Sequence, residues 1–484
     1  MAGLDAIVIG AGFGGLAAAI KLKRAGFGRL VVLEKADRLG GTWRDNTYPG
    51  AACDVPSRLY SYSFALNPNW SRAYSGQREI QRYLEDVAER FRVRPLIRFG
   101  AEVSRADWDE AAKVWRVTLA SGEVLEAPVL VSALGQLNRP HFAGIPGRER
   151  FKGESWHSAR WNHDVDLAGK TVACIGSGAS AIQYIPEVAK TAGKVLIFQR
   201  TPNYIIPRLD KPTPEWMKRL FAAAPAVDRA MRWAIWQMMD LRFRAFKRDT
   251  KSAWAFRKLA IGYLEREIAD PELRAKLTPD YPIGCKRILI SDDYYQTLTR
   301  PNVELITDAV AGITPNGVKT ADGAEHACDV IVYGTGFDTT HFLAPLEIHG
   351  LGGRTLSDAW KDGAEAYLGV TVSGFPNLFM LYGPNTNLGH NSIIVMLEAQ
   401  ADYIVKCLRE LRRRKAKALE VKPAAQSAFN VQLQKDLEAT AWAGECSSWY
   451  KTASGKITNN WSDDTATYRR RTARPAFGDY AFAA

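Results

Sequence analysis

Two glycine-rich turns carry the residues whose types and spacing point most directly to chemistry. The first turn, Gly10-x-Gly12-x-x-Gly15, follows a predicted buried strand and opens a predicted helix. The next predicted strand, at 29–34, ends on Glu34. In such a unit the glycines permit a tight turn, close approach of a pyrophosphate and close helix–strand packing, while the acid accepts hydrogen bonds from ribose hydroxyls. The pattern therefore predicts a dinucleotide-binding site.

The same unit recurs at 169–203 with one change of chemistry. Its turn is Gly176-x-Gly178-x-x-Ala181, and Arg200 stands 24 residues after the first glycine, where the first unit has its acid. An acid at that position suits an unmodified ribose, whereas Arg suits a 2′-phosphate through a charge-assisted, bidentate contact. The two units therefore predict two different dinucleotides, and FAD with NADPH is the pair that fits.

Three further segments are dense in aromatic or polar residues. Residues 40–64 are richer in Gly and aromatic residues than a plain crossover, although a surface loop with aromatic side chains is the simpler alternative. Residues 151–162, FKGESWHSARWN, connect the two units and are too irregular for an amphipathic helix or an alternating strand. Residues 281–300 contain the adjacent bases Lys286 and Arg287, for which a surface salt bridge is the simpler alternative.

The order of these elements predicts an α/β protein with two Rossmann-like dinucleotide-binding domains and a helical insertion in the second. A strand, an Asn-rich loop and a long helix starting near Asn391 and Ser392 follow at 367–411, and the positive end of that helix suits an electron-rich flavin edge. We expect the FAD-binding domain at 1–145 and 326–484, the NADPH-binding domain at 146–207 and 281–325, and the insertion at 208–280.

The predicted insertion carries most of the chain's formal net charge of +12. Between Trp216 and Ala260 there are eleven bases and three acids, together with several Trp and Met residues. A helical lid with a solvated basic face is the simplest interpretation. Contact of 216–260 with an anionic membrane surface is the second, and nucleic-acid binding is disfavoured because no recognised motif accompanies the charge.

Cysteine usage and the N-terminus indicate a cytoplasmic protein. The six cysteines are far apart, with no C-x-x-C pair and no Cys/His cluster, so neither a disulfide framework nor a metal site is predicted. For the same reason a disulfide reductase is disfavoured. The N-terminal apolar run is short and broken by Gly, so we expect no signal peptide, and we predict no transmembrane segment.

With these motifs identified, the chain resembles the class B flavoprotein monooxygenases, and within them the type I Baeyer–Villiger monooxygenases. The connector is similar to the family fingerprint F-x-G-x-x-x-H-x-x-x-W-[PD] at Phe151, Gly153, His157 and Trp161, and departs from it at Asn162. A second family pattern, [AG]-G-x-W-x-x-x-x-[FY]-P-[GM]-x-x-x-D, is matched by Gly40, Gly41, Trp43, Tyr48, Pro49, Gly50 and Asp54. The turn YGTGFD at 333–338 also looks like a family motif.

The resemblance implies roles for individual residues. Arg287 corresponds to the catalytic arginine, Asp54 to the carboxylate that positions it, and His157 to a conformational or proton-transferring histidine of the connector, of which we favour the hinge role. Lys286, Arg200 and Thr201 resemble 2′-phosphate contacts, Trp43 and Tyr60 flavin-packing residues, and Trp449 a tryptophan that closes over NADP. The remaining predicted cofactor-binding residues are Thr42, Val103, Ser177 and Ser180.

The implied reaction converts a ketone and dioxygen into an ester or lactone through a flavin C4a-peroxide, with NADPH as reductant. Oxygenation of sulfur or nitrogen by a related flavin monooxygenase is the alternative enzyme function. A flavin-bearing redox module that uses its basic helices on a membrane is the alternative outside catalysis.

Overall fold

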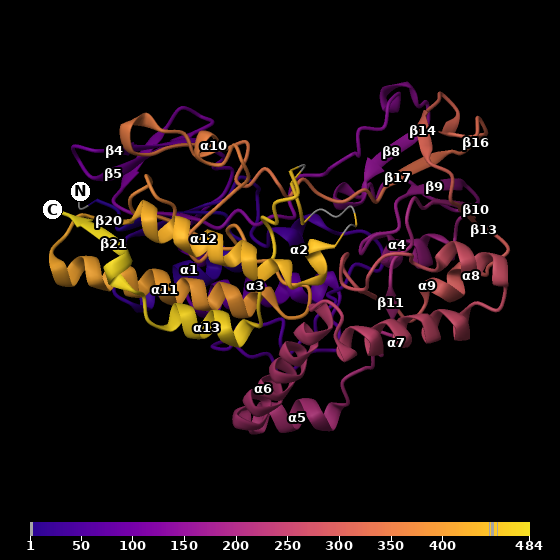
Figure 1. Cartoon of the computed structure of the whole chain (residues 1–484), viewed down its shortest axis with the longest axis horizontal. Helices are drawn as coiled ribbons and strands as arrows, with labels where there is room; N and C mark the ends of the chain where they lie inside the picture. Colours follow the sequence, from indigo (N-terminus) through magenta and orange to yellow (C-terminus); the bar gives the residue numbers. More distant parts are fainter. Residues whose placement is uncertain (1–2, 445, 447–449, 453) are drawn as a thin grey trace.

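Two five-stranded parallel sheets form the centres of two lobes that lie side by side (Figure 1). The computed structural model describes residues 3–444, 446, 450–452 and 454–484. In the first lobe the strand order is β19-β7-β1-β2-β3. These strands are β1 (Ala6–Ile9), β2 (Leu30–Leu33), β3 (Ile97–Arg98), β7 (Leu130–Ser132) and β19 (Leu378–Met380), and the helices beside them are α1 (Phe13–Arg24), α3 (Gln77–Arg90) and α11 (Ile393–Arg414).

The second sheet has the order β13-β10-β9-β17-β8. Its strands are β8 (Glu154–His157), β9 (Thr171–Ile175), β10 (Lys194–Phe198), β13 (Val303–Ile306) and β17 (Val330–Tyr333), with α4 (Ala181–Val188) and α9 (Tyr294–Leu298) packed beside them. Each predicted unit thus folds as strand, turn, helix and parallel strand. The prediction of an α/β fold with two Rossmann-like units is confirmed.

The connector between the two units corrects one prediction. Residues 154–157, expected to be irregular, form β8, an edge strand that pairs in parallel with β17 and places His157 opposite Tyr333. The position before this strand requires glycine, because a Cβ at Gly153 would meet the Asp329 carbonyl oxygen and the ring of Phe151. This pairing joins segments far apart in the chain, so periodicity within the connector could not reveal it.

The division of the chain into domains stays a proposal, with one refinement. Strand β17 at 330–333 pairs with β9 and β8, so the chain is still within the second sheet there. We therefore place the return to the first lobe after Tyr333 rather than at 326. The strands β11 (Ile205–Ile206) and β12 (Leu289–Ile290) pair with each other on either side of the insertion and close its base.

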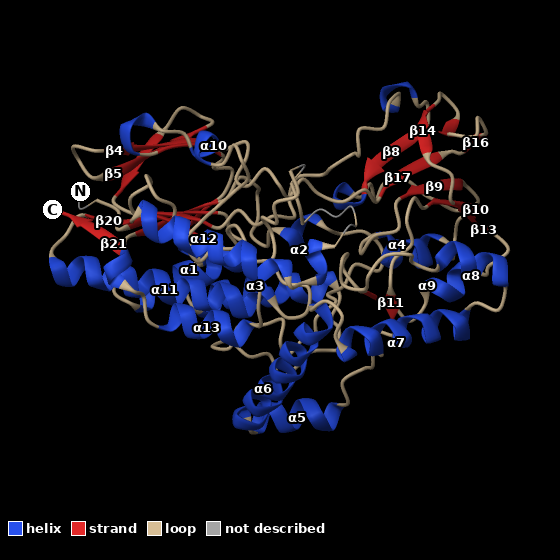
Figure 2. Cartoon of the chain, in the orientation of Figure 1, coloured by secondary structure: helices blue, strands red, loops and turns tan. Residues whose placement is uncertain are grey.

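The insertion is helical, as predicted (Figure 2). Its elements are α5 (Glu215–Ala223), α6 (Pro225–Leu241), the 3₁₀ turn η4 (Arg242–Phe246), α7 (Lys251–Glu267) and α8 (Pro271–Leu277). Helices α5 and α6 pack against each other and extend from the body of the molecule at the lower edge of Figure 1. Among the residues that the structure describes, no helix is both long and apolar enough to span a bilayer.

Smaller sheets and C-terminal helices complete the two lobes. The predicted meander forms β4 (Val103–Asp109), β5 (Val114–Leu119) and β6 (Val124–Ala127), joined by β18 (Glu347–His349). The second lobe carries a hairpin sheet of β14 (Val310–Ile313), β15 (Gly317–Thr320) and β16 (Glu325–Ala327). Helices α12 (Pro423–Glu438) and α13 (Thr465–Ala473), with the strand pair β20 (Ala418–Val421) and β21 (Tyr480–Ala483), cover the first lobe.

Candidate active site

One cavity of about 800 Å³ brings most of the predicted site residues together. Residues from both lobes line it, including Thr42, Trp43, Asp54, Tyr60, Gly176, Ser177, Gly178, Ser180, Arg200, Thr201, Lys286 and Arg287. The first glycine-rich turn, Glu34, Val103 and His157 lie outside its walls. Trp449 lies outside the residues that the structure describes. The long-range convergence of these segments is the feature on which a chemical interpretation depends.

Arg287 and Asp54 form an ion pair in the cavity wall. Asp54 Oδ2 accepts hydrogen bonds from Arg287 Nε at 2.9 Å and from Nη2 at 2.5 Å. The carboxylate of Asp54 raises the pKa of Arg287, so the guanidinium stays charged at any working pH. Both side chains retain partial exposure toward the cavity, 28% and 26%. The pair therefore presents a fixed cation whose donors are not all used by the protein.

Arg200 and Lys286 form a second positive site in the same cavity. Burial, followed by the nearby positive charge of Arg200, lowers the pKa of Lys286. Lys286 Nζ lies 4.8 Å from the ring centroid of Tyr281. In the described part of the chain, neither cation forms a salt bridge with a carboxylate. Two neighbouring cations without a directly paired carboxylate are suited to a phosphate.

Both glycine-rich turns have the backbone geometry of a phosphate cradle. Gly10 and Gly176 adopt φ of +98° and +104°, and Gly15 has no room for a side chain because a Cβ would clash with the Gly10 carbonyl oxygen. At Gly178, by contrast, no described atom lies within 4 Å of a Cβ position. The space in front of this turn is therefore open to a ligand that approaches the backbone.

Glu34 is held in place by several donors. Its Oε2 accepts a hydrogen bond from the Ala11 amide at 2.9 Å, while Oε1 accepts from the Ala36 amide at 3.0 Å and from Arg44 Nη1 at 2.8 Å. A carboxylate offers about four acceptor positions. One position on Oε2 is thus left unused, which is where the sequence pattern predicts a ribose hydroxyl.

Aromatic residues cover the side of the cavity that faces the first lobe. Trp43 Nε1 donates to the hydroxyl of Tyr60 at 3.1 Å, and the two rings meet edge to face with centroids 5.6 Å apart. Tyr382, at φ +61°, donates to Asn387 Oδ1 at 2.6 Å and also lines the cavity. Desolvation raises the pKa of Tyr382, so its phenol is protonated at neutral pH.

Among the residues of this wall that the sequence did not assign to the site are Tyr382, Asn387 and Gln183, while Tyr48 entered only as a match to a family pattern. Tyr382 and Asn387 lie in the predicted Asn-rich loop, whose density of hydrogen-bonding residues was the available signal. Tyr48 donates to Gln183 Oε1 at 3.0 Å, which bridges the loop after α2 (Thr42–Asp45) to α4. Burial raises the pKa of Tyr48 to about 12. Gln183 sits inside a helix pattern that carries no functional signal.

His157 occupies a structural position rather than a place in the cavity. The ring is 2% exposed, and its Nδ1 accepts a hydrogen bond from the Ala159 amide at 3.1 Å, which caps the 3₁₀ turn η3 (Ser158–Arg160). Its neighbours include the rings of Phe142 and Phe337, with centroids at 5.4 and 5.7 Å. Burial lowers the pKa of His157 to about 4. A buried imidazole outside the cavity is poorly placed for proton transfer, and the hinge role stays a prediction.

We expect His157→Asn to reduce the acid sensitivity of folding. Because the folded pKa is about 4 and the ordinary value is 6.5, the unfolded chain binds more protons between these values, and stability from this group falls as pH drops through that window. By about pH 5, protonation of His157 in the unfolded chain has lowered the free energy of unfolding by roughly 2 kcal/mol. Urea unfolding of both proteins at neutral and acidic pH measures the difference. Equal acid sensitivity in the two proteins would contradict a neutral, buried His157.

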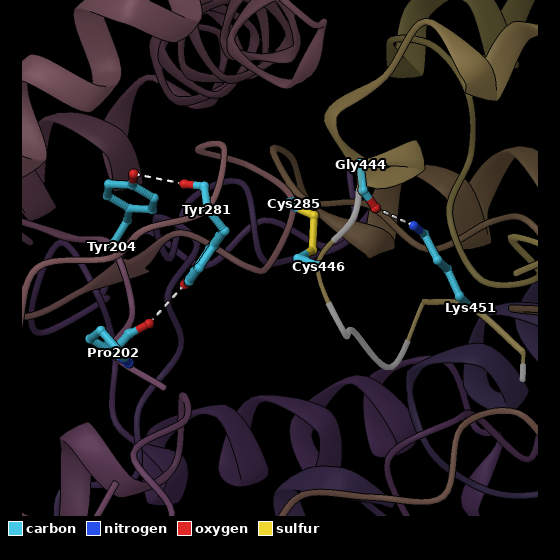
Figure 3. The surroundings of a disulfide bond; sticks show 7 residues. All are labelled: Pro202, Tyr204, Tyr281, Cys285, Gly444, Cys446 and Lys451. Carbon is cyan, nitrogen blue, oxygen red and sulfur yellow. Dashed lines mark hydrogen bonds between the residues drawn. A yellow bond between two sulfur atoms is a disulfide. The ribbon is translucent and has the colours of Figure 1, made fainter. Parts of the chain in front are cut away.

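The cysteines provide a second correction, because Cys285 and Cys446 form a disulfide (Figure 3). They are 161 residues apart in the chain, a spacing that no local pattern reveals. The bond ties the segment before Lys286 to the C-terminal region. Tyr281 precedes Cys285 in the same segment. Its carbonyl accepts a hydrogen bond from the Tyr204 hydroxyl at 2.8 Å, and its hydroxyl donates one to the Pro202 carbonyl at 2.9 Å.

The Cys285–Cys446 disulfide determines how many free thiols the protein should contain. Protein denatured without reductant is expected to titrate four thiols, those of Cys53, Cys174, Cys328 and Cys407, and reduced protein six. Cys285→Ser should lower the apparent melting temperature by roughly 5 °C, because a long closed loop is lost. Cys328→Ser, at a partly exposed free thiol, is the control. Six titratable thiols before reduction would contradict the bond.

Known proteins resemble this chain along nearly its whole length. The sequence model described as pyridine nucleotide-disulphide oxidoreductase matches residues 7–211, a range that contains neither disulfide cysteine. A Baeyer–Villiger monooxygenase of Streptomyces coelicolor is 45% identical over 98% of this chain and 91% of that protein. One from Pseudomonas aeruginosa is 41% identical over 96% of this chain and 89% of its own length.

Solved structures extend the similarity to three dimensions. A cyclohexanone monooxygenase from Rhodococcus sp. Phi1, bound to NADP+, matches with a TM-score of 0.90 and 30% identity over 99% of both chains. An oxidized steroid monooxygenase bound to NADP matches with a TM-score of 0.89 and 32% identity, again over 99% of both. With such relatives aligned along nearly its whole length, the chain belongs to the Baeyer–Villiger monooxygenase family.

Proposed function

We propose that this protein uses FAD, NADPH and dioxygen to convert a ketone into an ester or lactone. In balanced form, ketone, dioxygen, NADPH and a proton give ester, NADP+ and water. The observation that carries the proposal is the single cavity in which Arg287, fixed by Asp54, shares the walls with the second glycine-rich turn and the Trp43–Tyr60 pair. Family membership and the bound NADP or FAD of the similar structures support it.

The residues present fit both dinucleotides. Glu34 and the turn Gly10–Gly15 would hold FAD, since Glu34 keeps one free acceptor position and the turn is closed to side chains. Gly178 would face the pyrophosphate of NADPH because the space before it is open, and Arg200 with Lys286 would hold the 2′-phosphate. Thr42, Val103, Ser177, Ser180, Thr201 and Trp449 stay proposed cofactor contacts.

The chain's own residues supply electrostatics and exclusion of water. FAD, when bound, supplies hydride acceptance from NADPH and the activation of dioxygen. Negative charge develops on oxygen when a ketone carbonyl is attacked, and the Arg287 guanidinium, in a partly buried wall, would stabilise that charge. Asp54 orients Arg287 through two hydrogen bonds. The aromatic residues Trp43, Tyr60 and Tyr382 line the cavity and would help to exclude water from the bound cofactors.

A substrate panel tests this function. Purified holoenzyme is given NADPH with cyclic, linear and aryl ketones, and with sulfides, and products are identified by mass spectrometry. We expect an ester or lactone from at least one ketone class. Oxidation of sulfides alone would contradict the proposal in favour of heteroatom oxygenation.

A further inference from the structure

Large apolar side chains that face solvent are concentrated in the helical insertion. Trp216 is 64% and Trp233 58% exposed. Within the described chain, all exposed large apolar residues except Val124 and Val431 lie between Leu209 and Leu259. Single exposed apolar residues are ordinary on a protein surface, but a concentration of this kind marks an interaction site.

On α6 these residues form a continuous stripe. Val227, Met231, Ala234, Met238 and Leu241 follow one another at intervals of four, three, four and three residues, and all are exposed. This spacing places them on one side of a helix. The opposite side of α6 is used for folding, because Met239 and Asp240 are buried there. The stripe is therefore an apolar face without a partner in the described chain.

The charges around the stripe are positive at the surface. Asp228 is buried against Arg58 at 2.7 Å, and Asp240 accepts hydrogen bonds from Asn391 Nδ2 and Thr465 Oγ1, both at 2.7 Å. These two acids thus neutralise little at the surface. The exposed bases of α5, α6 and the turn into α7 are Arg219, Arg229, Arg244, Lys247, Arg248 and Lys251, and they outnumber the exposed acids of the same segment, Glu215 and Asp249.

We propose that α5 and α6 dock on an anionic phospholipid bilayer surface through the insertion patch, defined as Trp216 of α5 and the stripe residues Val227, Met231, Met238 and Leu241 of α6. Exposed Trp and aliphatic residues suit the boundary between headgroups and acyl chains, and the surrounding bases attract anionic headgroups. The projection of both helices from the body leaves room for a flat partner (Figure 1). A second copy is a poorer fit, because pairing two patches would bring their exposed bases together.

The position of the patch connects it to the cavity. Asp240, at the end of α6, binds Asn391, which lines the cavity. The docked helices would thus sit directly beside the cavity wall. This binding does not depend on the proposed chemistry, and it is tested without substrate turnover.

Vesicle flotation tests the proposal with full-length holoenzyme. Phosphatidylcholine vesicles with and without phosphatidylglycerol are compared at low and high salt. We expect retention only on anionic vesicles, weakened by salt. Trp216→Ser with Met231→Ser should weaken binding about tenfold, and Arg219→Glu with Arg229→Glu on the order of a hundredfold.

Matched controls use equivalent residues elsewhere on the surface. Val431→Ser removes an exposed apolar side chain of α12, and Lys319→Glu with Lys435→Glu reverses two exposed bases outside the insertion. These variants should bind as the unmodified protein does. Absence of retention on anionic vesicles, or equal losses in patch and control variants, would overturn the proposal. A dimer in sedimentation velocity that only the patch variants dissociate, without lipid binding, would overturn it in favour of self-association.

Discussion

Arg287→Ala is expected to lower the rate of ester formation by about a thousandfold, because the variant lacks the only cation that Asp54 holds in the cavity wall among the described residues. NADPH should still bleach the bound yellow cofactor at nearly the normal rate, since Arg200 and Lys286 are untouched. Stopped-flow reduction and product yield therefore separate the two halves of the cycle. An unchanged ester yield would remove Arg287 from its assigned role.

Two companion variants sharpen this test. Arg287→Lys keeps a positive charge but cannot make the two-donor contact with one carboxylate oxygen, so we expect only partial recovery. Arg116→Ala removes an exposed arginine that pairs with Glu126 far from the cavity, and it should leave both rates unchanged. Loss of ester formation in Arg116→Ala would show that the assay reports folding rather than chemistry.

Arg200→Ala with Lys286→Ala is expected to abolish the preference for NADPH over NADH. A charge-assisted contact to phosphate contributes about 1.5–3 kcal/mol, so the KM for NADPH should rise at least about a hundredfold when both cations are lost. The KM for NADH should change little, because NADH has no 2′-phosphate. Initial rates with both nucleotides measure this.

The unmodified protein provides the reference for that comparison. We expect it to favour NADPH strongly, since no carboxylate pairs with either cation in the part of the chain that the structure describes. Lys319→Ala, at an exposed base outside the cavity, is the control for a general loss of positive charge. A preference for NADH in the unmodified protein would contradict the 2′-phosphate site.

Local patterns were sufficient to predict the two dinucleotide-binding units. Strand, turn and helix lie next to one another in the chain, so the spacing of Gly10, Gly15 and Gly176 is enough to predict the strand–turn–helix units. The helix start predicted near Ser392 is confirmed as well, because its hydroxyl accepts from the Ile394 amide and caps α11. Capping is a short-range interaction that the sequence displays directly.

Contacts between segments far apart in the chain could not be predicted from the spacing of residues within a motif. Arg287 and Asp54 are 233 residues apart, and only the family resemblance brought them together in advance. Nothing within either segment indicates the β8–β17 pairing or the Cys285–Cys446 bond. Such contacts are decided by how the two lobes pack, which depends on the whole chain rather than on any one motif.

Oxygen-18 labelling tests the central claim most directly. The holoenzyme is supplied with NADPH, labelled dioxygen and a ketone that the panel identifies as a substrate, and the product is analysed by mass spectrometry alongside NADPH consumption. We predict an ester or lactone that carries one labelled oxygen atom for each NADPH consumed. NADPH consumption with unlabelled product, or with no oxygenated ketone product at all, would contradict the assignment.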